Sequence, residues 1–301
     1  MEHLLSLGDL TRGELRDLLS TADHLRLHRF AARSACKGKA IALLGLQPAF
    51  RVRLAFEVAM AELGGRAMTY GAADLEPAWR NTPSDLARLL SCSTDAIVVC
   101  GPDPIAHILA AHASIPVIVG RSERGSPVDG LAVLITVRHH LGPLEGCRVA
   151  YVGDGNHTAH SLLVAGALAG MTVAVSHPRG FAPDPEVVTR ARELAAGTGG
   201  AILVTEDPGL AVADAQVVVA DSWGGDEEED PGRWHRFEGH RIDGTLLEQA
   251  APGVLLLHCL PVRRSVEVGE SVLDERWPDL SDLAENRIHA AKALLVRQLC
   301  R

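Results

Sequence analysis

Two arginines near the middle of the first half, Arg51 and Arg53, lie in a segment that could bind an anion. The segment 47–53 joins an apolar, strand-like run to a helix-like run, and the first turn of a helix has free backbone N–H groups that attract negative charge. Ala49 stands where a helix start favours Ser, Thr, Asn or Asp, and such a replacement costs about 0.5–2 kcal/mol. The sequence therefore predicts a phosphate-type site that lacks hydroxyl groups.

Polar residues also follow three later strand-like runs, and ligands of open parallel sheets collect at the carboxyl ends of strands. These residues are Asn156, Asp221, Ser222 and the run His258-Cys259-Leu260-Pro261. Asn156 could cap the following helix or face a ligand, and both readings stay open. His258 and Cys259 are neighbours on a strand, so their side chains should point to opposite faces. A Cys–His catalytic pair is therefore not expected from these two residues alone.

Two further patterns lack a required partner. Gly153 and Gly155 follow a strand, but the third glycine of a dinucleotide-binding turn is absent, and the next strand ends in Ser-His rather than in an acid for a ribose. His139 and His140 lie at a helix end, but no third metal ligand lies nearby in the sequence. We therefore predict neither a nicotinamide site nor a metal site.

These residues must be positioned by strands and helices that alternate along both halves of the chain, which is typical of parallel sheets covered on both faces. We expect strands at 40–46, 66–71, 96–100, 116–120, 148–152, 172–176, 201–205, 216–220 and 254–258. We expect helices at 54–63, 84–91, 104–113, 130–141, 157–169, 185–196 and 283–299, and another that begins after an N-cap at Thr11 and ends near Leu27. The segments 72–83 and 121–129 are predicted as polar loops.

The length of 301 residues exceeds the usual size of one hydrophobic core, so two domains are expected. We place the first at residues 1–140 and the second at 141–301, with the last helix, about 283–299, packing back on the first domain. A net charge of -9 gives no reason to expect a nucleic-acid or membrane partner. The six cysteines form no C-x-x-C pair and the N-terminus has no signal-peptide pattern, so a cytoplasmic location is expected.

Several motifs together resemble the aspartate/ornithine carbamoyltransferase family, across essentially the whole chain. The most specific are the segments 284–293 and 258–261, and the segments 56–65 and 152–156 match as well. The continuation 262–268 is most similar to the branch that acts on acylated ornithines. The resemblance implies an α/β fold of two doubly wound parallel-sheet domains joined by interdomain helices, and a homotrimer with sites at subunit interfaces. It also implies a reaction without metal or organic cofactor, in which an amine attacks the carbonyl of carbamoyl phosphate.

The anion-binding residues of that family are only partly present here. Its Ser-Thr-Arg-Thr-Arg loop corresponds to residues 49–53, which keep both arginines and lose every hydroxyl. An arginine normally found after the strand 96–99 is replaced by Cys100, and the His-Pro-x-Gln motif aligns with residues 126–129, where Asp129 adds a negative charge. Each lost charge-assisted hydrogen bond is worth about 1.5–3 kcal/mol, so four or five losses would abolish ordinary turnover unless other residues compensate.

By resemblance, the residues expected to carry the chemistry are Arg51, His258, Cys259 and Arg287, and those expected to bind substrate are Asn156, Asp221, Ser222, Leu260 and Arg53. We expect an enzyme that acts on a small, ornithine-like or modified amino acid in specialised amino-acid metabolism and does not use carbamoyl phosphate in the usual way. Two alternatives stay open. One is an inactive homologue that serves as an amino-acid-binding or regulatory subunit, and the other is a true carbamoyltransferase with a rebuilt site.

Overall fold

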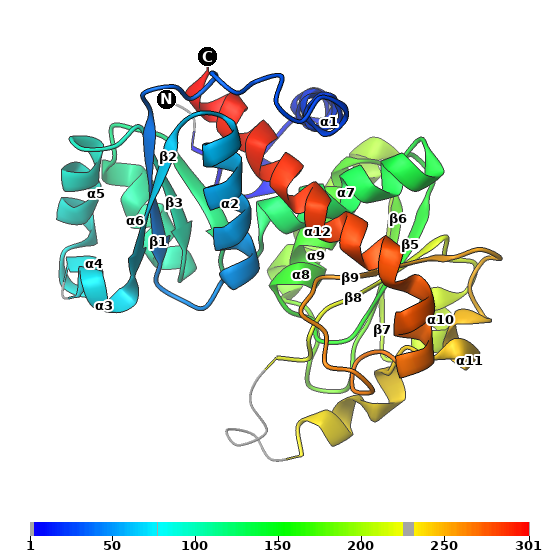
Figure 1. Ribbon diagram of the computed structural model, residues 1–301. Helices are drawn as coiled ribbons and strands as arrows, with labels where there is room; N and C mark the ends of the chain where they lie inside the picture. The colour runs from blue at the N-terminus through cyan, green and yellow to red at the C-terminus, as the bar shows by residue number, and fades with distance from the viewer. Residues whose placement is uncertain (1–2, 77, 225–231, 301) are drawn as a thin grey trace. The chain divides into compact units, whose positions relative to one another are not determined.

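The computed structural model describes residues 3–76, 78–224 and 232–300, and the chain forms two compact units. The first unit comprises Met1–Ile135 and Asn286–Arg301, and the second comprises Thr136–Glu285. Each unit contains one parallel sheet with helices on both faces (Figure 1), which confirms the predicted fold class. Two helices, α7 (Pro127–Leu141) and α12 (Glu270–Leu299), contain the points where the chain passes from one unit to the other.

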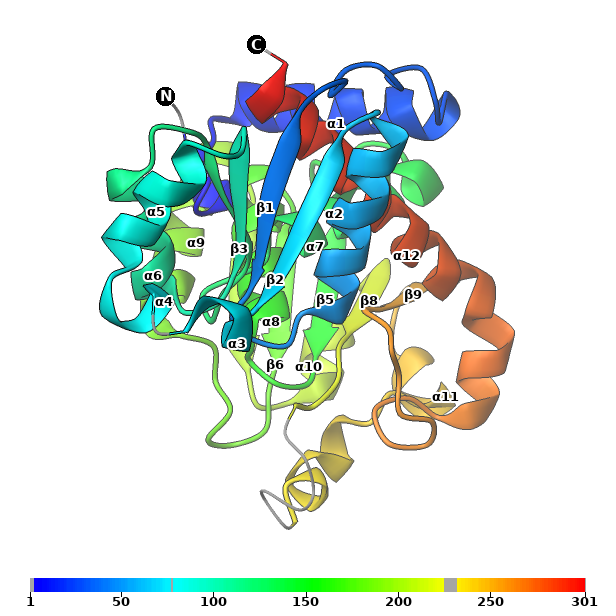
Figure 2. The ribbon, with the colours of Figure 1, turned by 60° about the vertical axis from the view of Figure 1, so that its left-hand side comes forward.

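The first unit has four strands in the order β2-β1-β3-β4. They are β1 (Ala40–Gly45), β2 (Arg66–Gly71), β3 (Ala96–Cys100) and β4 (Val117–Arg121). The remaining elements of this unit are η1 (Leu7–Asp9), α1 (Arg12–Leu27), α2 (Phe50–Glu62), α3 (Ala72–Leu75), α4 (Ala78–Asn81), α5 (Pro83–Ser91) and α6 (Asp103–His112). Figure 2 shows α5 and α6 on one face of the sheet and α2 on the other. Leu86 on α5 and Leu109 on α6 pack against buried strand residues such as Val99.

The second unit has five strands in the order β7-β6-β5-β8-β9. They are β5 (Arg148–Val152), β6 (Thr172–Ser176), β7 (Ala201–Thr205), β8 (Val217–Ala220) and β9 (Leu255–His258). The other elements are α8 (His157–Leu168), α9 (Pro185–Thr198), α10 (Pro208–Val212), η2 (Trp234–His240) and α11 (Gly244–Leu247). One core cluster joins β5, β8 and β9 to α10, α11 and α12 through residues such as Val218, Leu246 and Leu273.

In each unit the chain adds strands first on one side of the first strand, β1 or β5, and then on its other side. Crossovers that leave a strand in opposite directions open a crevice at its carboxyl end, and ligands bind there in open α/β sheets. The segments that follow these two strands are 46–49 and 153–156. The topology therefore predicts ligand binding at the same two loops that the sequence selected.

All nine strands agree with the predicted ranges within one residue at each end. The predicted N-cap at Thr11 is confirmed, because its side chain accepts from the backbone N–H of Glu14 in a capping box. Four predictions are wrong. Helix α2 starts at Phe50 instead of 54, directly after Ala49. The segment 72–83 is not a loop, because it forms the short helices α3 and α4. The closing helix starts at Glu270 instead of 283, since Pro278 is accommodated inside it.

The segment 121–129 is likewise not a loop throughout, because its end is helical. Helix α7 starts at Pro127, and the backbone N–H of Asp129 lies 3.4 Å from Oγ of Ser126. Serine before a helix and proline at its first position are both start signals, so this helix begins three residues earlier than expected. As a result Asp129 has a fixed place in the first turn of a helix.

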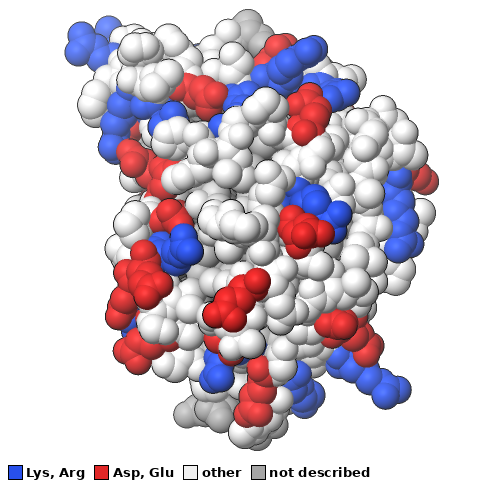
Figure 3. Space-filling model, turned by 90° about the vertical axis from the view of Figure 1, so that its right-hand side faces the viewer, with Lys and Arg blue, Asp and Glu red and all other residues white. Residues whose placement is uncertain are grey.

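Charged side chains are interspersed on the face shown in Figure 3, where Lys and Arg alternate with Asp and Glu without a broad area of one sign. Among the described residues, no helix is both long enough and apolar enough to cross a membrane.

Candidate functional site

The loop after β1 lines a pocket in the first unit. Helix α2 has Ala49 as its N-cap, and no side chain of the described residues caps it, as the sequence predicted. The pocket has a volume of about 280 Å³, and its lining includes Leu46, Gln47, Pro48, Phe50, Arg53 and Cys100. Among the described residues that line the pocket, Arg53 is the only basic one, and its side chain is 46% exposed with Nε 3.8 Å from the carboxylate of Glu57. This pocket therefore offers mostly apolar surface where the sequence predicted an anion site.

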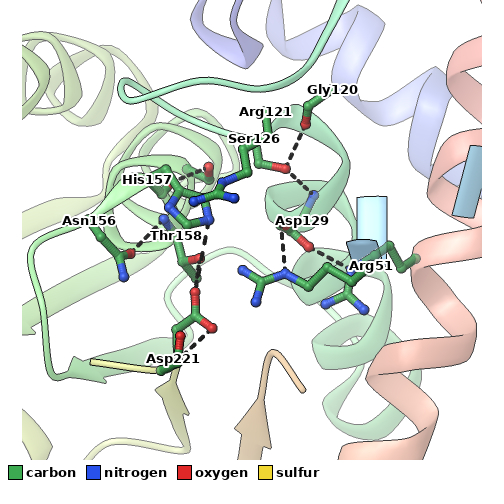
Figure 4. Close-up of polar contacts among 12 residues, drawn as sticks. Arg51, Gly120, Arg121, Ser126, Asp129, Asn156, His157, Thr158 and Asp221 are labelled. Atoms are coloured by element: carbon green, nitrogen blue, oxygen red, sulfur yellow. Dashed lines mark hydrogen bonds and ion pairs between the residues drawn. The ribbon is translucent and has the colours of Figure 1, made fainter. Parts of the chain in front are cut away.

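Asp129 brings together the two other arginines that the sequence selected. Its carboxylate accepts a hydrogen bond from Nε of Arg287 at 2.6 Å and lies 3.6 Å from Nε of Arg51 (Figure 4). The Asp129 side chain is 1% exposed, and those of Arg287 and Arg51 are 5% and 16% exposed. A buried carboxylate between two guanidinium groups neutralises much of their charge. The retained arginines are thus already engaged by an anion that belongs to the chain itself.

The Nη2 group of Arg287 could still bind a ligand. Its Nη2 is buried and has no hydrogen-bond partner within residues 3–76, 78–224 and 232–300. A buried N–H group without a partner costs about 1–3 kcal/mol, more when it is charged, so such groups are rare in stable structures. An acceptor on a bound molecule would satisfy this donor.

Arg121 supplies a further guanidinium at the loop after β1. Its side chain donates to the backbone carbonyl of Pro48, and its position at the end of β4 is the register partner of Cys100 at the end of β3. Cys100 is buried, and this burial raises the pKa of its thiol to about 12. The family resemblance expects an arginine where β3 has Cys100, and in this chain Arg121 on the neighbouring strand β4 carries a positive charge beside that position.

In the second unit, Asn156 and Asp221 are linked through Thr158. Asn156 caps α8 by accepting from the backbone N–H groups of Thr158 at 2.8 Å and Ala159 at 3.4 Å. The hydroxyl of Thr158 donates to Oδ2 of Asp221 at 2.5 Å, and Nε2 of His157 lies 4.0 Å from the same oxygen (Figure 4). Asn156 thus has the capping role that the sequence left open, and its amide NH₂ group is a separate donor that could face a ligand.

The residues after β9 lie beside Asp221. Strands β8 and β9 are adjacent, with Ala220 in register with His258, and the backbone N–H of Cys259 donates to the carbonyl of Ala220 at 3.1 Å. Both His258 and Cys259 are buried, and Leu260 packs against the core of this unit. The backbone N–H of Ser222 donates to Oδ1 of Asp221 at 2.9 Å. Asn156, Asp221, Ser222 and Leu260, which the sequence predicted to bind substrate, therefore all follow the carboxyl ends of strands in the sheet of the second unit.

Asp154, in the turn after β5, forms an ion pair that the sequence did not predict. Nη2 of Arg233 donates to its Oδ2 at 2.6 Å, and the Arg233 guanidinium also stacks on the rings of Phe181 and Phe237. Burial raises the pKa of Asp154 to about 6, and Arg233 opposes this rise. The carboxyl is held within the same turn as Asn156.

Sequence reasoning did not identify Thr158, His157 or Arg121 as candidate residues. A threonine two positions after an N-cap asparagine gives no local signal, because its partner Asp221 is 63 residues away. Arg121 could have been found by aligning the ends of β3 and β4, since parallel strands bring their carboxyl ends to one edge.

Comparison with known proteins gives two matches to models of one family. Residues 2–139 match "Aspartate/ornithine carbamoyltransferase, carbamoyl-P binding domain", and residues 145–297 match "Aspartate/ornithine carbamoyltransferase, Asp/Orn binding domain". Among similar proteins, the ornithine carbamoyltransferase of Acidothermus cellulolyticus is 42% identical over 299 residues, which cover 98% of this chain and 96% of that protein.

Solved structures are similar over nearly the whole chain. The ornithine carbamoyltransferase of Pyrococcus furiosus is 38% identical with a TM-score of 0.94, and the match covers 99% of this chain and 97% of the other. A mutant N-acetyl-L-ornithine transcarbamylase bound to PALAO is 26% identical with a TM-score of 0.87, and the match covers 99% of this chain and 100% of that one.

Proposed function

This chain belongs to the aspartate/ornithine carbamoyltransferase family, and we propose that it is a transferase that acts on an ornithine-like or modified amino acid without binding carbamoyl phosphate in the usual way. The substrate belongs to specialised amino-acid metabolism, and the reaction needs no metal or organic cofactor. The ornithine carbamoyltransferase-like character rests on the similarity over both domains. The altered donor rests on the contacts of one residue, Asp129.

Asp129 supports an altered donor because its carboxylate engages the two arginines that the family resemblance assigns to the donor. Its carboxylate lies 2.6 Å from Nε of Arg287 and 3.6 Å from Nε of Arg51. A phosphate dianion would have to displace this carboxylate or lie against its negative charge in a buried site, where charge repulsion is weakly screened. An uncharged or singly charged leaving group would avoid much of this repulsion.

The candidate residues divide into those that bind the donor and those that bind the amino acid. By the family resemblance, Arg51 and Arg287 are assigned to the donor, His258 and Cys259 to its carbonyl group, and Arg53 to the anion loop. Asn156, Asp221, Ser222 and Leu260 bind the amino acid. In the reaction, the amine nitrogen forms a bond to the carbonyl carbon, the leaving group departs with the electron pair of its bond, and the nitrogen loses a proton.

Arg121 favours a second candidate function, a true carbamoyltransferase with a rebuilt site. Its guanidinium contacts the loop after β1 from the strand position beside Cys100. A cation at this place could compensate for the arginine that Cys100 replaces. In that case, restoring Ser, Thr, His and Gln at positions 49, 52, 126 and 129 should change turnover little.

Product formation separates these possibilities from an inactive homologue that acts as an amino-acid-binding or regulatory subunit. The purified protein is incubated with ornithine and with acylated ornithines, each combined with carbamoyl phosphate or with other activated carbamoyl and acyl donors, and products are detected by mass spectrometry. We expect product only with a donor other than carbamoyl phosphate. A citrulline-type product from carbamoyl phosphate at a normal rate contradicts the altered donor, and no product from any pair supports the inactive homologue.

Thermal stabilisation gives an independent measure of binding, because a ligand that binds only the folded state raises its stability by mass action. We expect ornithine analogues to raise the melting temperature and carbamoyl phosphate to have little effect. Stabilisation by micromolar carbamoyl phosphate would refute the altered donor. We also propose that the protein is a homotrimer, which light scattering on the purified protein tests.

A further inference from the structure

Two histidines and an aspartate form a cluster in the second unit that includes none of the residues assigned to substrate. His139 and His140 lie in the last turn of α7, and Asp282 lies on α12. Nε2 of His140 is 2.8 Å from Oδ2 of Asp282, and Nδ1 of His139 is 3.3 Å from the same oxygen. All three residues belong to the unit Thr136–Glu285. The carboxylate is thus the third potential ligand that was not found near the histidines in the sequence.

The spacing of these atoms fits the coordination sphere of a small cation. One ligand atom from each of the three side chains lies within 4.8 Å of the other two. A metal with bonds of about 2.0–2.2 Å to nitrogen and oxygen places neighbouring ligands of a tetrahedron roughly 3.3–3.6 Å apart. The nitrogen–oxygen separations of 3.3 and 2.8 Å are near this value, so small side-chain movements would admit an ion.

The surroundings also favour positive charge and access. The cluster is at the C-terminal end of α7, where the helix dipole stabilises cations. The side chains of His139, His140 and Asp282 are 39%, 31% and 22% exposed, so water can reach the cluster and fill a fourth position. Two imidazoles and one carboxylate suit Zn²⁺, Co²⁺, Ni²⁺ and Cu²⁺ better than Mg²⁺ or Ca²⁺, which prefer oxygen ligands only.

We propose that His139, His140 and Asp282 form a binding site for one divalent transition-metal ion of the zinc class, with water as the remaining ligand. The ion would connect the end of α7 to α12 within the second unit. His140 and Asp282 are 142 residues apart in the sequence, so the unfolded chain would not hold the ligands together. The bound ion would therefore stabilise the folded unit against unfolding.

The test is a Co²⁺ titration of the full chain without a histidine tag, followed by visible absorption and by competition with Zn²⁺. We expect one Co²⁺ per chain, with a tetrahedral spectrum and no thiolate-to-metal charge-transfer band in the near ultraviolet. His140→Ala and Asp282→Asn should each weaken binding at least about tenfold, because even indirect partners of metal ligands commonly contribute 10–100-fold. Zn²⁺ should raise the melting temperature of the wild type but not that of Asp282→Asn.

The matched control is His235→Ala. His235 also pairs with a carboxylate, with Nδ1 2.6 Å from Oε1 of Glu238, and both side chains are highly exposed. This variant should keep the wild-type affinity for Co²⁺. The proposal is overturned if the wild type binds no stoichiometric Co²⁺, if Asp282→Asn binds as tightly as the wild type, or if a thiolate band shows that cysteine is the ligand. Circular dichroism of each variant confirms that weaker binding does not come from unfolding.

Discussion

Replacing Asp129 with Asn removes one buried negative charge and keeps the size of the side chain. In the wild type this carboxylate lies 2.6 Å from Nε of Arg287 and 3.6 Å from Nε of Arg51. The variant leaves both guanidinium groups in place without their common anionic partner. We expect the variant to bind inorganic phosphate and carbamoyl phosphate much more tightly than the wild type.

The magnitude follows from the charge separation. Two unit charges at the 3.6 Å that separate Arg51 and Asp129 attract each other by about 4–5 kcal/mol at an effective dielectric constant of about 20. An external anion must replace this attraction, and each 1.4 kcal/mol corresponds to about a tenfold change in affinity. Part of the gain is lost to dehydration of the anion, so we expect phosphate to bind roughly 10²-fold more tightly.

The same change should destabilise the free protein. Removing one partner of a buried ion pair commonly costs about 3–5 kcal/mol, because the other charges are left buried without compensation. Saturating phosphate should restore much of this loss in Asp129→Asn. Isothermal titration calorimetry measures the affinity, and urea unfolding with and without phosphate measures the stability.

The control is Glu57→Gln, which removes a carboxylate near the same loop. Glu57 is 3.8 Å from Nε of Arg53, and both side chains are more than 40% exposed, so its charge is well screened. This variant should bind phosphate as the wild type does. If Asp129→Asn gains no affinity for phosphate, or if Glu57→Gln gains as much, the carboxylate of Asp129 is not the group that keeps phosphate from Arg51 and Arg287.

Three further predictions concern the second unit. Asn156→Ala should lower the free energy of unfolding by about 0.5–2 kcal/mol through loss of the α8 cap, which urea unfolding measures, and loss of binding to ornithine analogues beyond this would indicate a ligand contact. Thr158→Val should cost about 1.5–3 kcal/mol, because the buried carboxylate of Asp221 loses a hydrogen bond of 2.5 Å; an unchanged unfolding midpoint would contradict this. The pKa of Asp154 is raised by burial to about 6, so the folded state binds more protons than the unfolded state between about pH 4 and pH 6. Stability should therefore decrease as pH rises through this window, and the decrease should be absent in Asp154→Asn when unfolding is measured from pH 4 to pH 7.

Local patterns determined the elements of this protein and the loops that carry its candidate site. The strands were found because continuous apolar runs such as 96–100 are bounded by turn residues, and burial on both faces of a parallel strand requires such runs. The alternation of strands and helices predicted two parallel-sheet units, and the carboxyl ends of the strands then indicated Arg51, Asn156 and Asp221. These inferences depend on residues within a few positions of one another.

The tertiary structure alone decided which distant side chains contact one another. Asp129 and Arg287 are 158 residues apart, and Asp282 is 142 residues from His140, so no local pattern relates either pair. The sequence indicated that a negative charge at 129 opposes an incoming dianion, but only the early start of α7 and the position of α12 show which cations it contacts. The physical reason is that hydrophobic periodicity and capping act over one or two turns of chain. Buried ion pairs and ligand clusters depend on which faces of distant elements pack together.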